Sequence, residues 1–166
     1  SVTSIYAAGS PQNDSYSIGE GLNAIDVDLS AGKGNDVILV MSGRNVIVNG
    51  GDDDDRISVS AMVTGLITVT GGLGKDDIRI LTPEDDTLVT YTSSALSGGV
   101  GDDSITGSIR TDIISGGLGR DNLVGLAGND TIYGEIINGN GPDDIDRIDA
   151  GDGNDVVWGN AGNDII

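Results

Sequence analysis

The chain has 166 residues, of which 27 are acidic and only 8 are Lys or Arg, so its formal net charge is -19. Such an acidic chain repels phosphate backbones and anionic membrane surfaces. The absence of His and Cys excludes zinc, haem and iron–sulfur sites, catalytic triads with an imidazole base, thiol nucleophiles and disulfides.

A nine-residue repeat organises the sequence from residue 31 onward. Ten copies share one register, with aspartate at position six and a large aliphatic residue at position eight. In chain order, position six is occupied by Asp36, Asp55, Asp76, Asp103, Asp112, Asp121, Asp130, Asp143, Asp155 and Asp164. Position eight is occupied by Ile38, Ile57, Ile78, Ile105, Ile114, Leu123, Ile132, Ile145, Val157 and Ile166, which we interpret as the buried column.

Less regular segments precede and separate these copies. GSPQNDSYS from Gly9 reads as a decayed copy with Tyr16 at position eight, and VMSGRNVIV places Asn45 and Ile47 at positions six and eight. We predict two regions: residues 1–30 form an irregular N-terminal segment that is a candidate capping coil, and residues 31–166 form the repeat domain. Loop insertions are expected near residues 80–97 and 134–149.

Each repeat divides into a turn and a short strand. Glycine at positions one, two and four permits positive φ and close backbone approach, so the first six residues suit a tight turn. The last three suit a strand in which position eight faces inward while positions seven and nine face solvent. Two repeats then close one coil of about 18 residues, and alternate repeats stack on the same side. The predicted fold is all-β, a right-handed parallel β-roll or β-helix solenoid.

The turns carry oxygen atoms suited to a hard cation. Calcium takes about six to eight oxygen ligands from carboxylates and backbone carbonyls. Position-six carboxylates of successive same-side turns, with carbonyls exposed beside glycine, would enclose an ion between coils. Seven candidate pairs follow: Asp36/Asp55, Asp55/Asp76, Asp103/Asp121, Asp121/Asp143, Asp143/Asp164, Asp112/Asp130 and Asp130/Asp155.

The pattern GGxGxDxUx, with U a large aliphatic residue, resembles the RTX or hemolysin-type calcium-binding repeats of secreted bacterial proteins. Complete copies run over Gly71–Arg79, Gly98–Thr106 and Gly116–Val124, and the resemblance covers residues 31 to 166. It implies a calcium-binding parallel β-roll that holds several Ca²⁺ ions, about five to eight.

The same resemblance implies that position-six aspartates and turn carbonyls are the ligands. The candidate metal ligands are therefore Gly32, Gly34, Asp36, Gly51, Asp53, Asp55, Gly72, Gly74, Asp76, Gly99, Gly101, Asp103, Asp112, Gly117, Gly119, Asp121, Gly128, Asp130, Gly139, Gly141, Asp143, Gly151, Gly153, Asp155, Gly162 and Asp164. Arg110 at position four and Leu126 at position two depart from the pattern, so we expect the Asp112/Asp130 site to be weak, whereas Asp53 at position four adds charge.

The functional interpretation is a structural module rather than an enzyme. The resemblance implies secretion, by the type I route, and folding upon calcium binding outside the cell. A carbohydrate-binding or adhesive module is the alternative, because Tyr133 and Trp158 both occupy outward position nine on one side. Glycoside hydrolysis by paired carboxylates is disfavoured, since the chain has only three Glu and no convergent acid pair stands out.

The final repeat stops at its position eight, Ile166. Because a solenoid needs capping elements, we expect the chain to adjoin other domains of a longer parent protein. We also expect calcium, by lowering the net charge, to promote end-to-end association between molecules.

Overall fold

The computed structural model describes residues 4–83, 90–135 and 144–166. These residues form fifteen β-strands. No helix among them is long and apolar enough to cross a membrane. Three predicted metal ligands, Gly139, Gly141 and Asp143, lie outside the described residues, as do parts of both predicted insertions.

The strands form two parallel sheets. The eight-stranded sheet contains, in spatial order, β1 (Ser4–Ala8), β3 (Asp26–Lys33), β5 (Val46–Asp52), β7 (Leu66–Leu73), β9 (Ser93–Val100), β11 (Asp112–Leu118), β13 (Thr131–Tyr133) and β15 (Val156–Trp158). The seven-stranded sheet contains β2 (Ser15–Ile18), β4 (Val37–Val40), β6 (Arg56–Ser60), β8 (Asp77–Leu81), β10 (Ser104–Ser108), β12 (Asn122–Leu126) and β14 (Arg147–Asp149).

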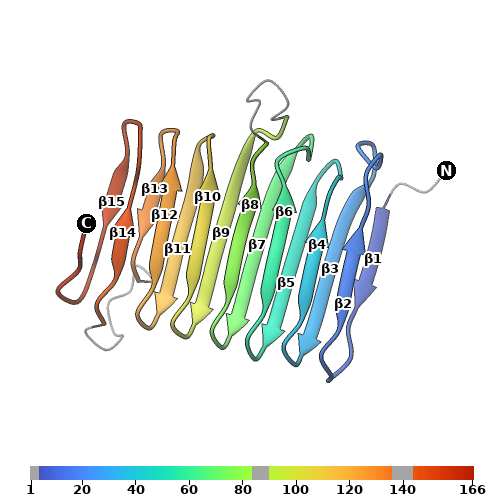
Figure 1. Ribbon diagram of the computed structural model, residues 1–166, viewed down its shortest axis with the longest axis horizontal. Helices are drawn as coiled ribbons and strands as arrows, with labels where there is room; N and C mark the ends of the chain where they lie inside the picture. Colours follow the sequence, from blue (N-terminus) through green and yellow to red (C-terminus); the bar gives the residue numbers. More distant parts are fainter. Residues whose placement is uncertain (1–3, 84–89, 136–143) are drawn as a thin grey trace.

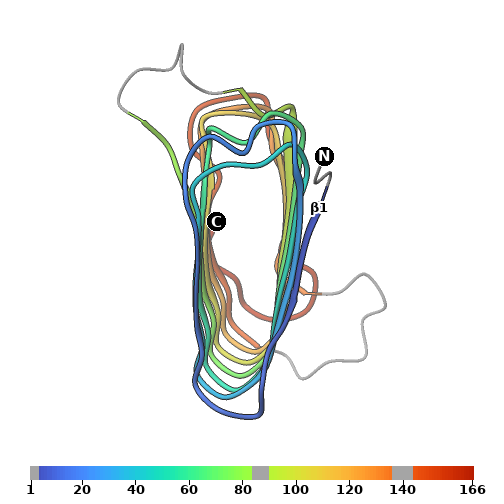
Figure 2. The ribbon, with the colours of Figure 1, turned by 90° about the vertical axis from the view of Figure 1, so that its right-hand side faces the viewer.

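Consecutive strands alternate between the sheets, so each pair of strands closes one coil of a solenoid with about seven turns (Figure 1). Viewed along its axis, the solenoid is a flattened loop whose two long sides are the sheets (Figure 2). This is the parallel β-roll that the repeat predicts. The predicted spacing of 18 residues holds between Asp103 and Asp121, whereas insertions lengthen the interval to 27 residues between Asp76 and Asp103.

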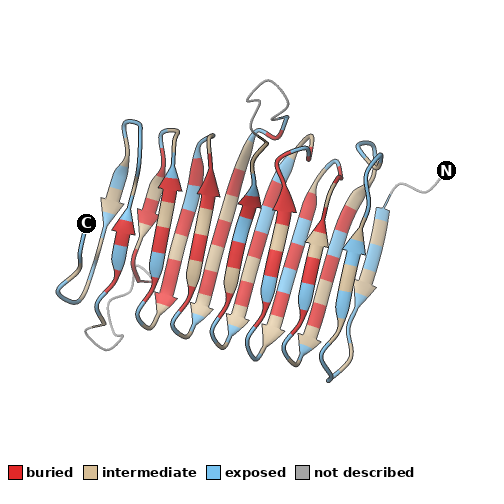
Figure 3. Ribbon diagram, viewed as in Figure 1, coloured by how far each residue is buried: buried red, intermediate tan, exposed pale blue. Residues whose placement is uncertain are grey.

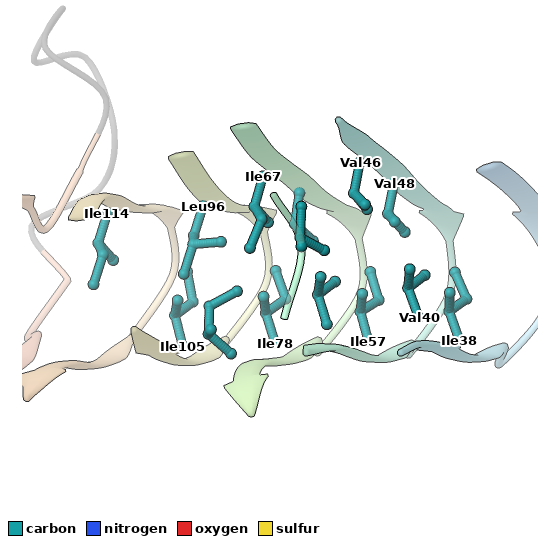
Figure 4. Packing of buried hydrophobic residues seen from close by; sticks show 14 of the residues in the cluster. Ile38, Val40, Val46, Val48, Ile57, Ile67, Ile78, Leu96, Ile105 and Ile114 are labelled. Atoms are coloured by element: carbon teal, nitrogen blue, oxygen red, sulfur yellow. The ribbon is translucent and has the colours of Figure 1, made fainter. Parts of the chain in front are cut away.

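The core is a double column of aliphatic side chains between the sheets (Figure 4). In the seven-stranded sheet, Ile57 pairs with Ile78 and Ile78 with Ile105, and all three are completely buried. Opposite them, Val48 pairs with Val69 and Val69 with Leu96. Alternate residues along the longer strands are buried (Figure 3), because neighbouring side chains of a strand point to opposite faces. The predicted position-eight column is therefore confirmed for most of its members.

The predicted register is wrong for the half-coil before β5. Ile47 was expected to point inward, yet it is 49% exposed, while Val46 and Val48 are buried. Val46 pairs with Val27 and Ile67, so it takes the place predicted for Asn45. An apolar run of three residues fits either register, and the inner faces of neighbouring strands decide between them.

Two predicted members of the buried column are exposed. Ile145 is 48% exposed, and Ile148 pairs with Leu123 in its place. Ile166 is 72% exposed, since the last coil has a neighbour on one side only.

The first thirty residues contribute to the roll. Strand β1 pairs with β3, and β2 pairs with β4. Tyr16 pairs with Ile38, as expected if GSPQNDSYS is a decayed repeat with Tyr16 at position eight.

Candidate metal centre

The turns form two edges of the roll. The first edge, at the bottom of Figure 1, comprises the turns that lead from the eight-stranded sheet to the seven-stranded sheet. The second edge, at the top, comprises the turns that lead back. Apart from Asp164, every position-six aspartate in the described residues begins a strand or directly precedes one.

Aspartates stack along the first edge from one coil to the next. In each step, the backbone N–H of one aspartate donates to Oδ1 of the aspartate one coil further along. The N···O distance is 2.8 Å for Asp55 to Asp76, for Asp76 to Asp103 and for Asp103 to Asp121. The complete ladder is Asp14, Asp36, Asp55, Asp76, Asp103, Asp121, Asp146 and Asp164.

Two members of this ladder, Asp14 and Asp146, are not among the predicted ligands. Asp146 lies between Asp121 and Asp164, with its amide 3.1 Å from Asp164 Oδ1, in the place that we had given to Asp143. Both Asp143–Ile145 and Asp146–Ile148 have aspartate two residues before isoleucine, so spacing alone could not separate them. The step between Asp76 and Asp103 was also not predicted as a pair, because the insertion between them hides their stacking.

The second edge carries a shorter ladder. The amide of Asp112 donates to Asp130 Oδ1 and that of Asp130 to Asp155 Oδ1, both over 2.9 Å. Before these coils the same position is occupied by Ser94, and still earlier by the aliphatic residues Val27, Val46 and Ile67. The second edge is thus an acidic edge only in its last three coils.

The second carboxylate oxygen of these aspartates is left without a partner. Buried Oδ2 atoms with no hydrogen bond among the described residues belong to Asp36, Asp55, Asp76, Asp103, Asp121, Asp130 and Asp146. Burying an ionised carboxylate oxygen without a donor or a cation is costly. Each of these atoms therefore needs a positively charged ligand or a proton.

The glycine at position one leaves space for such a ligand. A Cβ on Gly71 would lie 2.7 Å from the carbonyl oxygen of Gly98 and would also collide with Asp76 Oδ2. The same holds for Gly98, with the carbonyl oxygen of Gly116 at 2.6 Å and Asp103 Oδ2 beside it. A carboxylate oxygen and the position-one carbonyl of the next coil thus border one small space, and oxygen atoms alone suit calcium. Our prediction covered only the glycines at positions two and four.

Asp112 differs from the other ladder members because donors reach both of its oxygens. Ser94 Oγ lies 2.5 Å from Oδ1, while the amide and hydroxyl of Ser108 lie 2.7 and 2.9 Å from Oδ2. Asp53 likewise has a donor, since the amide of Gly34 lies 3.1 Å from its Oδ2. Both oxygens of Asp112 and Oδ2 of Asp53 therefore have donors and do not require a cation.

Burial raises the pKa of the ladder carboxyls, with neighbouring carboxylates adding to the effect. The pKa of Asp121 rises to about 8 and those of Asp55 and Asp103 to about 7. The hydrogen bond from the preceding backbone amide opposes the rise in each case. The ionised ladder is therefore unfavourable by itself, and a cation between the turns would stabilise it.

The carboxylates lie one per coil. Nowhere in the described residues do three acidic side chains gather around one point. A metal ion at either edge would thus take one carboxylate from each of two coils and complete its shell with carbonyl oxygens. The residues present fit that arrangement, because turn carbonyls adjoin the unpartnered Oδ2 atoms.

Comparison with known families agrees with this geometry. Residues 28–57, 95–121, 106–136 and 137–166 match the RTX calcium-binding nonapeptide repeat, in four copies. The chain belongs to the RTX calcium-binding nonapeptide repeat family. No curated protein and no solved structure shows significant similarity to it.

The RTX glycines lie at both edges. On the first edge, Gly32, Gly34, Gly51, Gly72, Gly74, Gly99, Gly101, Gly117, Gly119 and Gly162 have positive φ. On the second edge the same is true of Gly128, Gly151 and Gly153. Their backbones pack coil against coil; a Cβ on Gly101, for example, would collide with the carbonyl oxygen of Gly74.

Proposed function

We propose that this RTX chain is the calcium-binding β-roll module of a secreted bacterial protein, exported by the type I route and folded by calcium outside the cell. The observation that carries the proposal is the set of seven buried Oδ2 atoms without a partner. A hard dication between successive turns supplies the missing charge at each of them. The role of the module is structural and linked to export.

Each ion is assigned to the gap between two consecutive turns of one edge. The ligands are the two position-six carboxylates, the position-one carbonyl of the later turn and the predicted carbonyls at positions two and four. The seven gaps are Asp36/Asp55, Asp55/Asp76, Asp76/Asp103, Asp103/Asp121, Asp121/Asp146, Asp146/Asp164 and Asp130/Asp155. Asp112/Asp130 is left out because Asp112 has donors on both oxygens.

Calcium on this scale is sufficient to decide folding. A tenfold excess over Kd contributes about 1.4 kcal/mol per site, so seven sites give about 10 kcal/mol. The whole stability of a typical domain is about 5 to 15 kcal/mol. We therefore expect far-UV circular dichroism at about pH 8 to show an unfolded chain in EGTA and β-structure in millimolar Ca²⁺, with titration calorimetry counting about seven ions. Equal β content in both buffers would contradict the proposal.

Carbohydrate binding is the second candidate. Tyr133 and Trp158 lie side by side on the outer face of the eight-stranded sheet, with ring centroids 4.8 Å apart and planes inclined by 5°. Each ring covers one face of the other, while Trp158 remains 45% exposed. Sugar rings stack on such faces, so loss of glycan binding in Trp158→Ala, tested on a glycan array with calcium present, would support this candidate.

A hydrolase is less compatible with the acids on the outer surface. In a hollow on the seven-stranded sheet, Asp77 is engaged by Arg79 at 2.7 Å and approached by Arg56 at 3.5 Å. Because guanidiniums engage this carboxylate, it is not free to approach and protonate a glycosidic oxygen. Assays of the calcium-loaded chain for glycosidase activity should be negative.

A further inference from the structure

Glu135 departs from the repeat at a position where the regular turns carry glycine. The amide of Gly117 donates to the carbonyl of Gly134 over 2.9 Å, which aligns Gly116 with Gly134 and Gly117 with Glu135. Glu135 therefore stands at position two of its turn. Unlike Gly117, it is not in the positive-φ region.

The side chain of Glu135 is buried, with 3% of its surface exposed. Its Oε2 accepts a hydrogen bond from the amide of Ala161 over 2.6 Å, while its Oε1 has no partner among the described residues. Nδ2 of Asn160 donates to the carbonyl of Glu135 over 3.0 Å. These contacts hold the carboxylate against the next coil, between Gly134 and Asp146 on one side and Gly159 and Asp164 on the other.

The same gap contains a second orphaned acid. Asp146 is completely buried and its Oδ2 has no partner in the described part of the chain. A Cβ on Gly134 would collide with that atom and would lie 2.5 Å from the carbonyl oxygen of Gly159. Two buried carboxylates with unpartnered oxygens thus share one gap with an exposed carbonyl.

We propose that Glu135 is a ligand of the calcium ion between Asp146 and Asp164, and that it makes this the tightest site of the roll. The proposal rests on the function proposed above and extends it to a residue that the nonapeptide pattern does not provide. Calcium sites gain affinity with the number of charged ligands. This gap holds two buried carboxylate oxygens without a partner among the described residues, Oε1 of Glu135 and Oδ2 of Asp146, whereas each of the other gaps holds one.

The chain contains a natural probe of this gap. Trp158 is its only tryptophan, precedes Gly159, and accepts the amide of Gly134 on its carbonyl over 2.8 Å. Terbium(III) takes the place of calcium and emits when a nearby tryptophan transfers energy to it. Emission excited through Trp158 therefore reports on the ions closest to Glu135.

The test compares Glu135→Gln with Glu20→Gln in the full chain, since Glu20 is an exposed glutamate. Gln keeps an oxygen for the Ala161 amide but loses the charge. We expect the terbium concentration at half-maximal Trp158-sensitised emission to rise about tenfold in Glu135→Gln and to stay unchanged in Glu20→Gln. In the wild type, calcium added in excess over terbium should compete for the site and lower the Trp158-sensitised emission.

A second variant separates ligation from charge. Glu135→Asp keeps the charge but is shorter, so it should also weaken terbium binding if Glu135 is a ligand. Emission from Glu135→Gln and Glu135→Asp at the wild-type midpoint would overturn the inference while leaving the proposed function intact. Absence of any metal-dependent emission or folding in the wild type would instead overturn both.

Stability without metal gives an independent readout. A purely structural glutamate would make Glu135→Gln less stable in EGTA at the acidic pH where the metal-free roll is most stable. A ligand role predicts no loss of stability, because Gln keeps an oxygen for the Ala161 amide and no metal is present for the carboxylate to bind. Urea titrations of both variants decide between these outcomes.

Discussion

Seven of the ladder aspartates use their two carboxylate oxygens for different purposes. Oδ1 accepts the backbone amide of the preceding coil and so ties successive turns together, as for Asp103 and Asp121. Oδ2 is left to a ligand. An asparagine side chain could accept the backbone amide with its oxygen. It would, however, place an NH₂ group where Oδ2 faces the cation, which explains why this position needs an acid.

This division of roles predicts opposite behaviour for Asp121 and Asp112. Asp121→Asn removes a charged ligand from the gaps shared with Asp103 and Asp146, so the calcium concentration at half-folding should rise about tenfold or more. Asp112→Asn should leave the calcium midpoint nearly unchanged, because its oxygens already bind Ser94 and Ser108. It should instead cost about 1–3 kcal/mol of stability, with or without calcium, by facing the Ser108 amide with another donor. Calcium titrations followed by circular dichroism compare the two; a larger shift for Asp112→Asn would contradict the site assignment.

The raised pKa values predict how the calcium-free chain responds to pH. The folded-state pKa of Asp121 is about 8 and that of Asp103 about 7, both above the unfolded value of about 3.9. The folded state therefore binds more protons, so stability without calcium is greatest at acidic pH and is lost progressively as pH rises from about 4 to about 8. In EGTA, the chain should be folded with a measurable urea midpoint at about pH 5 and unfolded at about pH 8, while in calcium the urea midpoint should be higher at about pH 8 than at about pH 5. A calcium-free chain with the same midpoint at both pH values would contradict the raised pKa values.

At the scale of strands, alternation predicts which side chains face inward but not always where the register starts. Position eight locates Ile57, Ile78 and Ile105 in the core because aspartate and glycine set the frame around them. In VIV at Val46–Val48, no aspartate marks the frame, and pairing with Val27 and Ile67 chooses it instead. Register is thus predictable wherever the turn has its full pattern.

The inward and outward faces of adjacent strands predict unequal costs for the same substitution. Ile105 on β10 is completely buried, whereas Ile113 on β11 is 51% exposed. Ile105→Ala should lower the free energy of unfolding by about 2–5 kcal/mol. Ile113→Ala should cost less than about 1 kcal/mol. Urea unfolding in saturating calcium measures both, and equal costs would mean that the assigned faces are wrong.

The ligands of the proposed metal sites show a second limit of prediction from sequence. The repeats predicted the ladder from Asp103 to Asp121, which are 18 residues apart. Asp146 was missed because an insertion separates it from Asp121 by 25 residues and offers a second aspartate-isoleucine pair. Glu135 was missed because only its burial and its contact with Ala161 distinguish it from a surface acid.

For the whole molecule, the chain's own cations compensate little of its charge. Ion pairs such as Lys33–Asp52 at 2.5 Å and Arg120–Asp102 at 3.2 Å join neighbouring coils, but both partners are solvent-exposed. Such pairs contribute about 0–1 kcal/mol each. Seven calcium ions would reduce the net charge from -19 to -5, and they would do so inside the edges where the carboxylates stack.

The ends of the first-edge ladder predict calcium-dependent head-to-tail association. Among the described residues, Oδ1 of Asp14 has no donor and the amide of Asp164 has no acceptor. At every internal step, by contrast, the amide of one aspartate donates to Oδ1 of the next. The last coil also exposes Trp158 at 45% and Ile166 at 72%. A contact between the last coil of one molecule and the first coil of another would continue both ladder and sheets, and such a heterologous contact leaves new ends free. We expect sedimentation to show monomers in EGTA and concentration-dependent oligomers in millimolar Ca²⁺. Ile166→Asp should reduce association without changing the calcium midpoint, and a folded, strictly monomeric species at high concentration would show that the first or last coil caps the roll.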